Sequence, residues 1–178
     1  MNTKIIVIYN IIGFIGSGGI LLSTVVSKKG NIMKTQTAAT AVLFVADLLA
    51  KGYSGAAQDI IGVIRNITVM KNIHKKWLSL LFIASGLLLG ILCNNQGLVG
   101  FLPIFANFQF SCIVLKKDVD EILIKLSVCV SNICWGLFNF HLMNYANMAV
   151  NIAICTSAVI FVVREIMRRK KAISEADA

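Results

Sequence analysis

Lys and Arg gather in every second connection between seven apolar stretches of this 178-residue chain. The basic connections follow the first, third and fifth stretches, and the last stretch ends in a basic segment. The residues concerned are Lys28, Lys29, Lys34, Lys71, Lys75, Lys76, Lys116, Lys117, Lys125, Arg164, Arg168, Arg169, Lys170 and Lys171. Because cytoplasmic loops of membrane proteins are enriched in Lys and Arg, this alternation predicts seven spans with the N-terminus outside and the C-terminus in the cytoplasm.

The composition excludes a soluble domain. The chain is 57% apolar and 14% charged, with a mean hydropathy of +0.81, whereas soluble domains are about 45–50% apolar and about 25% charged. We therefore expect the lipid bilayer to be a partner of most of the chain. A net charge of +9 would suggest nucleic acid in a soluble protein. Here the charges lie in short loops and a terminal segment, which favours anionic headgroups and excludes nucleic acid as a partner.

The apolar stretches are close to the length of a membrane helix, about 17–25 residues. They cover residues 5–26, 35–51, 55–70, 77–94, 97–115, 121–140 and 143–165. The third is short and polar, but omitting it would place two basic clusters on opposite sides of the membrane. The sequence predicts an all-α membrane protein, with a single transmembrane domain over 1–167 and a charged cytoplasmic tail over 168–178.

A weak internal repeat supports the odd number of spans. An offset of about 89 residues aligns spans one to three with spans five to seven in hydropathy and loop length. Two triplets of the same orientation, 5–70 and 97–165, need one inverting helix between them, and span 77–94 supplies it. The sequence thus predicts a 3+1+3 bundle of parallel repeats, a design found among transporters.

Polar side chains recur on one face of four spans, at spacings of i, i+3, i+7 or i, i+4, i+8. Such side chains usually face the interior of a bundle. They either bond helices to one another or line a central cavity for a small polar solute. The candidate substrate-binding residues are Gln58, Asp59, Asn66, Asn107, Asn132, Trp135, Asn139, Asn147 and Asn151. For Trp135 the alternatives are stacking on a solute and ordinary packing.

Three ionisable residues lie inside predicted spans. Asp47 is four residues before Lys51, which predicts a local helix ion pair. Arg65 lies near enough to the cytoplasmic end to extend its charge to the interface. Asp59 has no such partner, so it is the better candidate for a buried acid that binds a cation or a proton.

Two further features predict local geometry. Gly13 and Ser17 form a small-xxx-small pair, which predicts a close helix contact. Pro103 is the only proline, and it predicts a kink in the fifth span.

Catalytic and metal-binding signatures are missing from the sequence. Five cysteines show no CxxC spacing, so neither a disulfide framework nor a zinc site is expected, and no cofactor is expected. The chain also lacks HExxH, GxSxG, paired carboxylates and a plausible Cys/His dyad, so we do not expect an enzyme.

Several short motifs resemble those of the YgjV-type bacterial inner-membrane proteins. They are Ile64-Arg65 before a basic loop and Trp77, Leu102-Pro103-Ile104, Cys134-Trp135 with Asn139-Phe140, and the Asn-rich seventh span. The resemblance covers about residues 5–167. It implies a multi-pass protein of the bacterial cytoplasmic (inner) membrane.

The hydropathy plan of that family is similar to the MtN3/SWEET and PQ-loop class, which includes vitamin facilitators of the PnuC type. The similarity implies a 3+1+3 bundle with an outward N-terminus and a central solute site. In the sugar facilitators an Asn on each of the third and seventh helices lines that site. By resemblance Asn66 or Gln58 would supply the first, and Asn147 or Asn151 the second. The chain has one proline where those proteins have four, and no PQ dipeptide, so neither a sugar substrate nor proline hinges carry over.

We expect a small-solute transporter or facilitator that works by alternating access. The alternative is a non-transporting membrane scaffold or sensor, whose Asn residues only hold helices together. The sequence leaves open the solute, the coupling ion and a homo-oligomer.

Overall fold

The computed structural model describes residues 3–23, 29–71, 73, 75–114 and 119–176. Within them the chain forms seven helices and no strand. The helices are α1 (Thr3–Ser23), α2 (Lys29–Leu49), α3 (Tyr53–Met70), α4 (Lys76–Leu92), α5 (Phe101–Val114), α6 (Glu121–His141) and α7 (Tyr145–Ala176). The prediction of an all-α chain is confirmed. Lys28, Lys116 and Lys117, which helped to predict the topology, lie outside the described residues.

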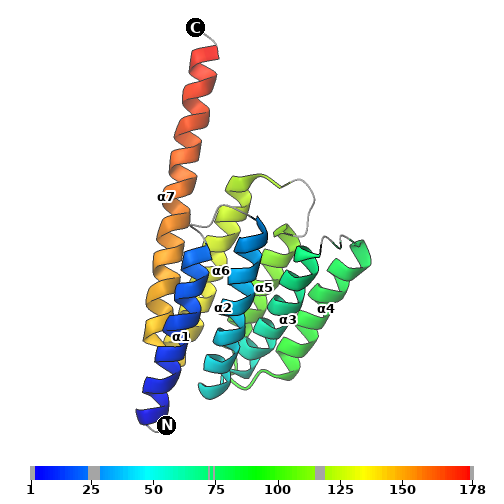
Figure 1. Cartoon of the computed structure of the whole chain (residues 1–178), viewed down its shortest axis with the longest axis vertical. Helices are drawn as coiled ribbons and strands as arrows, with labels where there is room; N and C mark the ends of the chain where they lie inside the picture. Colours follow the sequence, from blue (N-terminus) through cyan, green and yellow to red (C-terminus); the bar gives the residue numbers. More distant parts are fainter. Residues whose placement is uncertain (1–2, 24–28, 72, 74, 115–118, 177–178) are drawn as a thin grey trace.

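The helices form an antiparallel series (Figure 1) in which each one packs against the next along the chain. Two further contacts, α1 with α7 and α3 with α5, close this series. Among the described elements α4 contacts only α3 and α5. The short connections cause this order, because they leave neighbouring helices adjacent.

The surface of the bundle is apolar, as lipid requires. Large side chains such as Phe14, Leu80 and Leu92 are 60%, 68% and 70% exposed. Among the described helices, three are long and apolar enough to cross a membrane: Thr3–Ser23, Glu121–His141 and Tyr145–Ala172. Trp77–Leu92 and Phe101–Ile113 are shorter apolar helices.

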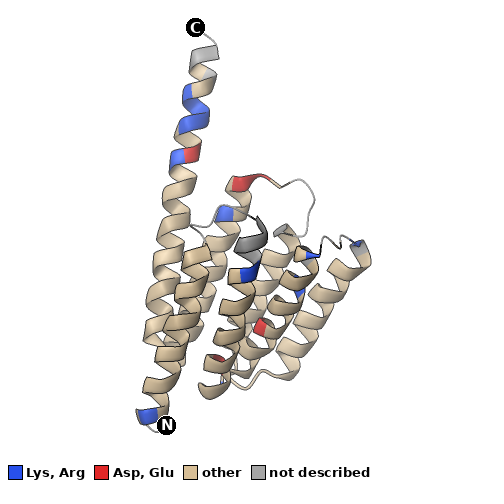
Figure 2. Ribbon diagram, in the orientation of Figure 1, with Lys and Arg blue, Asp and Glu red and all other residues tan. Residues whose placement is uncertain are grey.

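Positive charge gathers at one end of the bundle. Figure 2 shows Lys and Arg concentrated at the end from which α7 extends, with a further basic position at the start of α1, beside the N-terminus, at the opposite end. The sequence alternation therefore becomes a separation in space, and we refer to the two ends as the basic end and the opposite end.

The turn between α2 and α3 lies at the opposite end. Lys51 has a φ of 58°, and its N–H donates to the Leu48 carbonyl at 3.0 Å. The Gly52 N–H donates to the Asp47 carbonyl at 2.8 Å. These two bonds satisfy the last carbonyls of α2 in the Schellman arrangement.

The turn between α6 and α7 has the same geometry. Met143 also has a φ of 58°, and its N–H donates to the Phe140 carbonyl at 3.0 Å. The Asn144 N–H donates to the Asn139 carbonyl at 2.8 Å. The two turns correspond at an offset of 92 residues, from Lys51 to Met143. The offset of about 89 residues expected from hydropathy is therefore three residues too short at this point.

A dry cluster fills the opposite end. Tyr9, Ala46, Ala50, Phe138 and Leu142 are buried together there, from α1, α2 and α6. The Tyr9 hydroxyl donates to the Leu142 carbonyl at 2.8 Å. The hydroxyl thus binds a carbonyl near the end of α6, while its ring excludes water.

Pro103 does not kink α5. The helix begins at Phe101, so Pro103 is its third residue. A backbone N–H at this position would have no partner within the helix, and proline therefore removes no bond from it. The predicted kink is wrong because the span starts later than the apolar stretch.

The tail predicted over 168–178 is helical through Ala176. At 1.5 Å per residue α7 is about 48 Å long, and it extends well beyond the other helices (Figure 1). Arg169 fastens this extension to the start of α6, since its guanidinium donates to both carboxylate oxygens of Asp120, at 2.7 and 3.0 Å. Arg169 also donates to Glu165 at 2.9 Å.

Close contact between α1 and α2 uses a different pair of small residues from the one predicted. A Cβ at Gly19 would lie 2.9 Å from the Cβ of Ala39, and a Cβ at Gly16 would lie 2.8 Å from Leu43 Cγ. Gly13 instead faces Asn144 of the α6–α7 turn. Ser17 donates to the carbonyl of Gly13 within its own helix.

Gly19→Ala is expected to lower the free energy of unfolding by about 1–3 kcal/mol. The Ala39 methyl group is fixed to the backbone, so α1 and α2 must move apart. Gly18→Ala is the matched control, because a Cβ there meets nothing within 4 Å. Thermal unfolding in detergent, followed by helical circular dichroism, compares the two. Rescue of Gly19→Ala by Ala39→Gly is expected, and equal melting temperatures for the two single variants would contradict this contact.

The fastening of α7 is expected to depend on pH. The hydrogen bond from the Arg169 side chain, and then that from the Ile122 amide, hold the pKa of Asp120 below its ordinary value of 3.8. The ion pair is therefore complete above that value and is lost as the pH falls through the lower folded-state pKa. Hydrogen exchange over 164–176 should differ between the wild type and Asp120→Asn at about pH 6 and converge once the pH is below the folded-state pKa of Asp120. A difference that persists in acid would contradict this pairing.

Candidate functional site

Four of the nine predicted site residues fall into two hydrogen-bonded groups. Gln58 and Asn107 belong to a network on α3, α4 and α5. Asn139 and Asn147 are bonded to each other between α6 and α7. The first group joins the two triplets of the 3+1+3 plan, since Gln58 is on α3 and Asn107 is on α5, whereas the second group lies within one triplet.

The first network joins three helices through amide groups. Gln58 Nε2 donates to the Gly86 carbonyl of α4 at 2.7 Å. Asn107 Nδ2 donates to Gln58 Oε1 at 2.8 Å. Gln58, Asn107 and Ser111 also border a space of about 10 Å³ between these helices, which is about the volume that one water molecule needs.

Arg65 is the centre of this network, although the sequence placed its charge at the interface. Its side chain is buried, and Nη1 donates to Asn107 Oδ1 and to Ser111 Oγ, both at 2.8 Å. The Phe110 ring lies 5.1 Å from the guanidinium carbon. The prediction of an interfacial Arg65 is wrong, because α5 offers two acceptors one helical turn apart. The i, i+4 spacing of Asn107 and Ser111 can be read from the sequence, but the identity of the residue that donates to them cannot.

The second group bonds the start of α7 to its neighbours. Asn147 Nδ2 donates to Asn139 Oδ1 at 3.2 Å, and Asn139 Nδ2 donates to the Trp135 carbonyl at 2.9 Å. Asn10 of α1, which was not among the predicted residues, also belongs to this group. Its side chain accepts from the Ala146 N–H at 3.1 Å and thereby caps α7.

Three other predicted residues bond, pack or are buried within the protein. Asn132 Nδ2 donates to the Val128 carbonyl of its own helix at 2.8 Å. Trp135 packs edge to face on Phe138, with ring centroids 5.9 Å apart. This packing is the ordinary alternative for Trp135. Asn66 is buried on α3.

A third polar cluster, on α5 and α6, was not predicted. Ser127 Oγ donates to Gln109 Oε1 at 2.8 Å, and Gln109 Nε2 donates to Ser131 Oγ at 2.5 Å. All its members are bonded across the two helices. This cluster is therefore the interhelical bonding that polar groups commonly provide in membranes.

Asp47 and Lys51 do not form the predicted ion pair. The three ion pairs found among the described residues involve Glu165 and Asp120 with Arg168 and Arg169. Lys51 lies beyond the last residue of α2 with a positive φ, so its side chain is not on the helical face of Asp47. Asp47 Oδ1 is buried without a hydrogen-bond partner.

Five buried side-chain atoms in the described part of the chain have no hydrogen-bond partner. They are Asp47 Oδ1, Ser54 Oγ, Asp59 Oδ2, Asn144 Nδ2 and Asn151 Nδ2. Most buried polar atoms in proteins are bonded, so each exception points to strain, a functional role or a missing water or ligand. All five come from α2, α3 and the α6–α7 hairpin.

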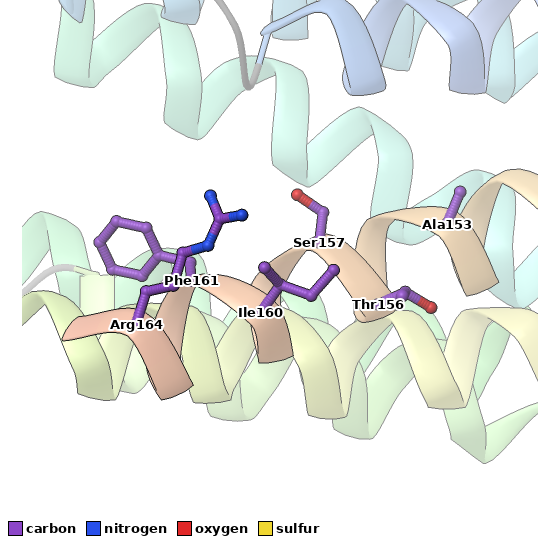
Figure 3. Close-up of a pocket in the computed structure, with 6 residues that line it drawn as sticks. All are labelled: Ala153, Thr156, Ser157, Ile160, Phe161 and Arg164. Atoms are coloured by element: carbon purple, nitrogen blue, oxygen red, sulfur yellow. The ribbon is translucent and has the colours of Figure 1, made fainter. Parts of the chain in front are cut away.

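An open groove of about 540 Å³ runs along the middle of α7. Its described lining combines hydroxyl, apolar and cationic side chains. The lining residues are Ala153, Thr156, Ser157, Ile160, Phe161 and Arg164 (Figure 3). Lys125 of α6 adds a second cation, with Nζ 5.0 Å from the Phe161 ring centroid.

Asn107→Leu is expected to lower the free energy of unfolding by about 1–3 kcal/mol, because it leaves a buried guanidinium and the Gln58 amide with fewer partners. The matched control is Asn132→Leu, which removes a bond within one helix only and should cost less. Melting temperatures in detergent provide the comparison. Equal losses for both variants would show that the Arg65 network is not needed for stability.

Comparison with known proteins gives one result. A family model described as Imp-YgjV, bacterial inner membrane protein, matches residues 7–169. Neither a curated protein nor a solved structure matches the chain. In the described residues, no group of three or more His, Cys, Asp or Glu side chains could hold a metal ion.

Proposed function

This chain belongs to the Imp-YgjV family of bacterial inner membrane proteins, and we propose that it transports a small polar solute across that membrane. Two triplets, α1–α3 and α5–α7, would move relative to each other and expose the solute to each side in turn. Helix α4 inverts the chain between them. The N-terminus lies outside, and the basic end lies in the cytoplasm. The proposed activity is transport without catalysis.

The pattern of helix contacts supports two related triplets. Exchanging α1, α2 and α3 for α5, α6 and α7 turns each contact between these six helices into another observed contact. The α1–α2 contact becomes α5–α6, α2–α3 becomes α6–α7, and α1–α7 becomes α3–α5. The matching turns at Lys51 and Met143 support the same relation. A two-fold axis along the membrane normal would produce this set of contacts.

One observation carries the transport proposal. Asp59 and Asn151 occupy equivalent places, since each lies eight residues after the positive-φ residue of its turn. Both are buried, and each has a polar atom without a hydrogen-bond partner. A scaffold has no reason to leave one open donor and one open acceptor at matching points of α3 and α7. A solute that accepts from one and donates to the other would satisfy both.

Unequal access to the two ends is consistent with this role. The dry cluster around Tyr9 and Phe138 closes the opposite end. The groove along the middle of α7 lies away from this cluster and is open. A transporter open to one side only has a closed end and more accessible space elsewhere.

The scaffold alternative also has a specific observation in its favour. The Gln109 cluster and the Arg65 network bond helices together without an open pocket of solute size. Gln58 of the Arg65 network is next to Asp59 in the chain, but neither cluster supplies a hydrogen-bond partner to Asp59 Oδ2 or Asn151 Nδ2. The scaffold alternative therefore accounts for Gln58 and Asn107 but does not account for the unpartnered atoms.

The test is a panel of sugars, vitamins and amino acids on the purified protein, scored first by thermal shift and then by flux into liposomes. Asn151→Ala is expected to abolish the shift and lower flux at least about tenfold, by loss of about 1.4 kcal/mol or more of binding. Asn132→Ala, which removes a bond within α6, should leave both unchanged. No shift and no flux with any solute, or equal flux for the wild type and Asn151→Ala, would overturn the proposal.

A further inference from the structure

We propose that Asp47 and Asp59 together form a proton-binding site between α2 and α3. The proposal deepens the proposed function and rests on it only for the consequence of protonation, because Asp59 is also part of the proposed solute site. Binding of the proton can be measured without any solute.

The two carboxyl groups lie along one face of α3. Asp47 extends from α2 over Gly55, so that a Cβ at Gly55 would overlap Asp47 Oδ2. Asp59 is four residues further on, one helical turn along the same face. Asp47 is 1% exposed and Asp59 is 5% exposed, so both carboxyl groups are shielded from bulk water.

The three ion pairs found among the described residues include neither Asp47 nor Asp59. On α3 the nearest cation in sequence is Arg65, whose Nη1 donates to Asn107 and Ser111. On α2, Lys29 and Lys34 lie in the first two turns, far along the helix from Asp47. Lys51 is exposed.

The other packed elements do not supply a counter-charge either. From α1 the titratable groups at this end are Tyr9, whose hydroxyl donates to Leu142, and Lys4, which is exposed in the first turn of the helix. On α4, Lys76 lies in the first turn, at the basic end. Helix α5 has Cys112 as its titratable side chain, and α6 covers Gly55 with the Phe138 ring. Two carboxylates without a counter-ion repel each other in a medium of low polarity, so at least one must hold a proton.

The second half of the chain gives an internal comparison. At the offset of 92 residues, Asp47 corresponds to Asn139 and Asp59 corresponds to Asn151. The backbone carbonyls of Asp47 and Asn139 accept the same turn bond, at 2.8 Å in both cases. Amides therefore suffice for this turn geometry. Acids in only one half add what amides cannot do, which is to take up and release a proton.

The net charge of the Asp47–Asp59 pair therefore depends on how many protons it holds. With one proton shared, the pair carries a single negative charge, and a second proton makes it neutral. If Asp59 holds the solute, its protonation determines whether it donates or accepts a hydrogen bond. Proton uptake would then be coupled to solute binding through this residue.

Infrared difference spectroscopy of the purified protein tests the site directly. The wild type is expected to show the C=O stretching band of a protonated carboxylic acid at neutral pH, and to lose it on alkalinisation. The double variant Asp47→Asn with Asp59→Asn, which keeps shape and removes the ionisable groups, should lack the band. Asp120→Asn is the matched control: its carboxylate is exposed and ion-paired, so the band should remain.

Melting temperatures show whether the double variant still folds. The double variant should melt near the wild type at neutral pH, and it should lose the decrease in stability that deprotonation causes in the wild type at alkaline pH. Absence of the band in the wild type would overturn the proposal, as would its persistence in the double variant. Stabilisation of the wild type but not the double variant by Na⁺, at constant ionic strength, would assign the site to a metal cation instead. Solute flux without the band would leave transport standing, and the band without flux would leave the proton site standing.

Discussion

Lipid offers no hydrogen bonds, so every polar group inside this bundle depends on partners within the protein. The backbone meets this demand by forming helices, and the Lys51 and Met143 turns use their own N–H groups to satisfy the last carbonyls of α2 and α6. Side chains meet it through clusters such as Gln109 with Ser127 and Ser131. The few polar atoms that remain open are therefore informative. They mark the buried positions at which a hydrogen bond is missing.

The two halves of the bundle share a frame but differ in chemistry. Their turns have the same backbone hydrogen bonds, but α2 and α3 carry acids at the points where α6 and α7 carry amides. The amide of Asn139 is bonded to Asn147, so the second half holds itself together at the point where the first half does not. The side chains at these equivalent points are therefore unequal, although the backbone of the two turns is the same.

Hydropathy predicted the helices well because lipid imposes their length, and the ends of most helices fall within a few residues of the apolar stretches. It failed where the deciding interaction is between residues far apart in sequence. Arg65 is buried because Asn107 and Ser111 accept its bonds from another helix, and no local pattern states that pairing. The expected Asp47–Lys51 pair failed for a local reason, since Lys51 leaves the helix at a positive φ. The repeat offset was three residues short because hydropathy averages over a turn, whereas the turn bonds define it residue by residue.

Closure of the opposite end and burial of the carboxyl pair depend on one side chain. A Cβ at Gly55 would meet Phe138 Cε1 at 2.7 Å and would also overlap Asp47. The Phe138 ring and the Asp47 carboxyl therefore share the same glycine surface. Phe138 is fully buried in the cluster that closes this end. If α6 moved as the proposed transport requires, the ring would leave Gly55 and water would reach Asp47. Glycine at position 55 is what allows the ring and the acid to lie so close.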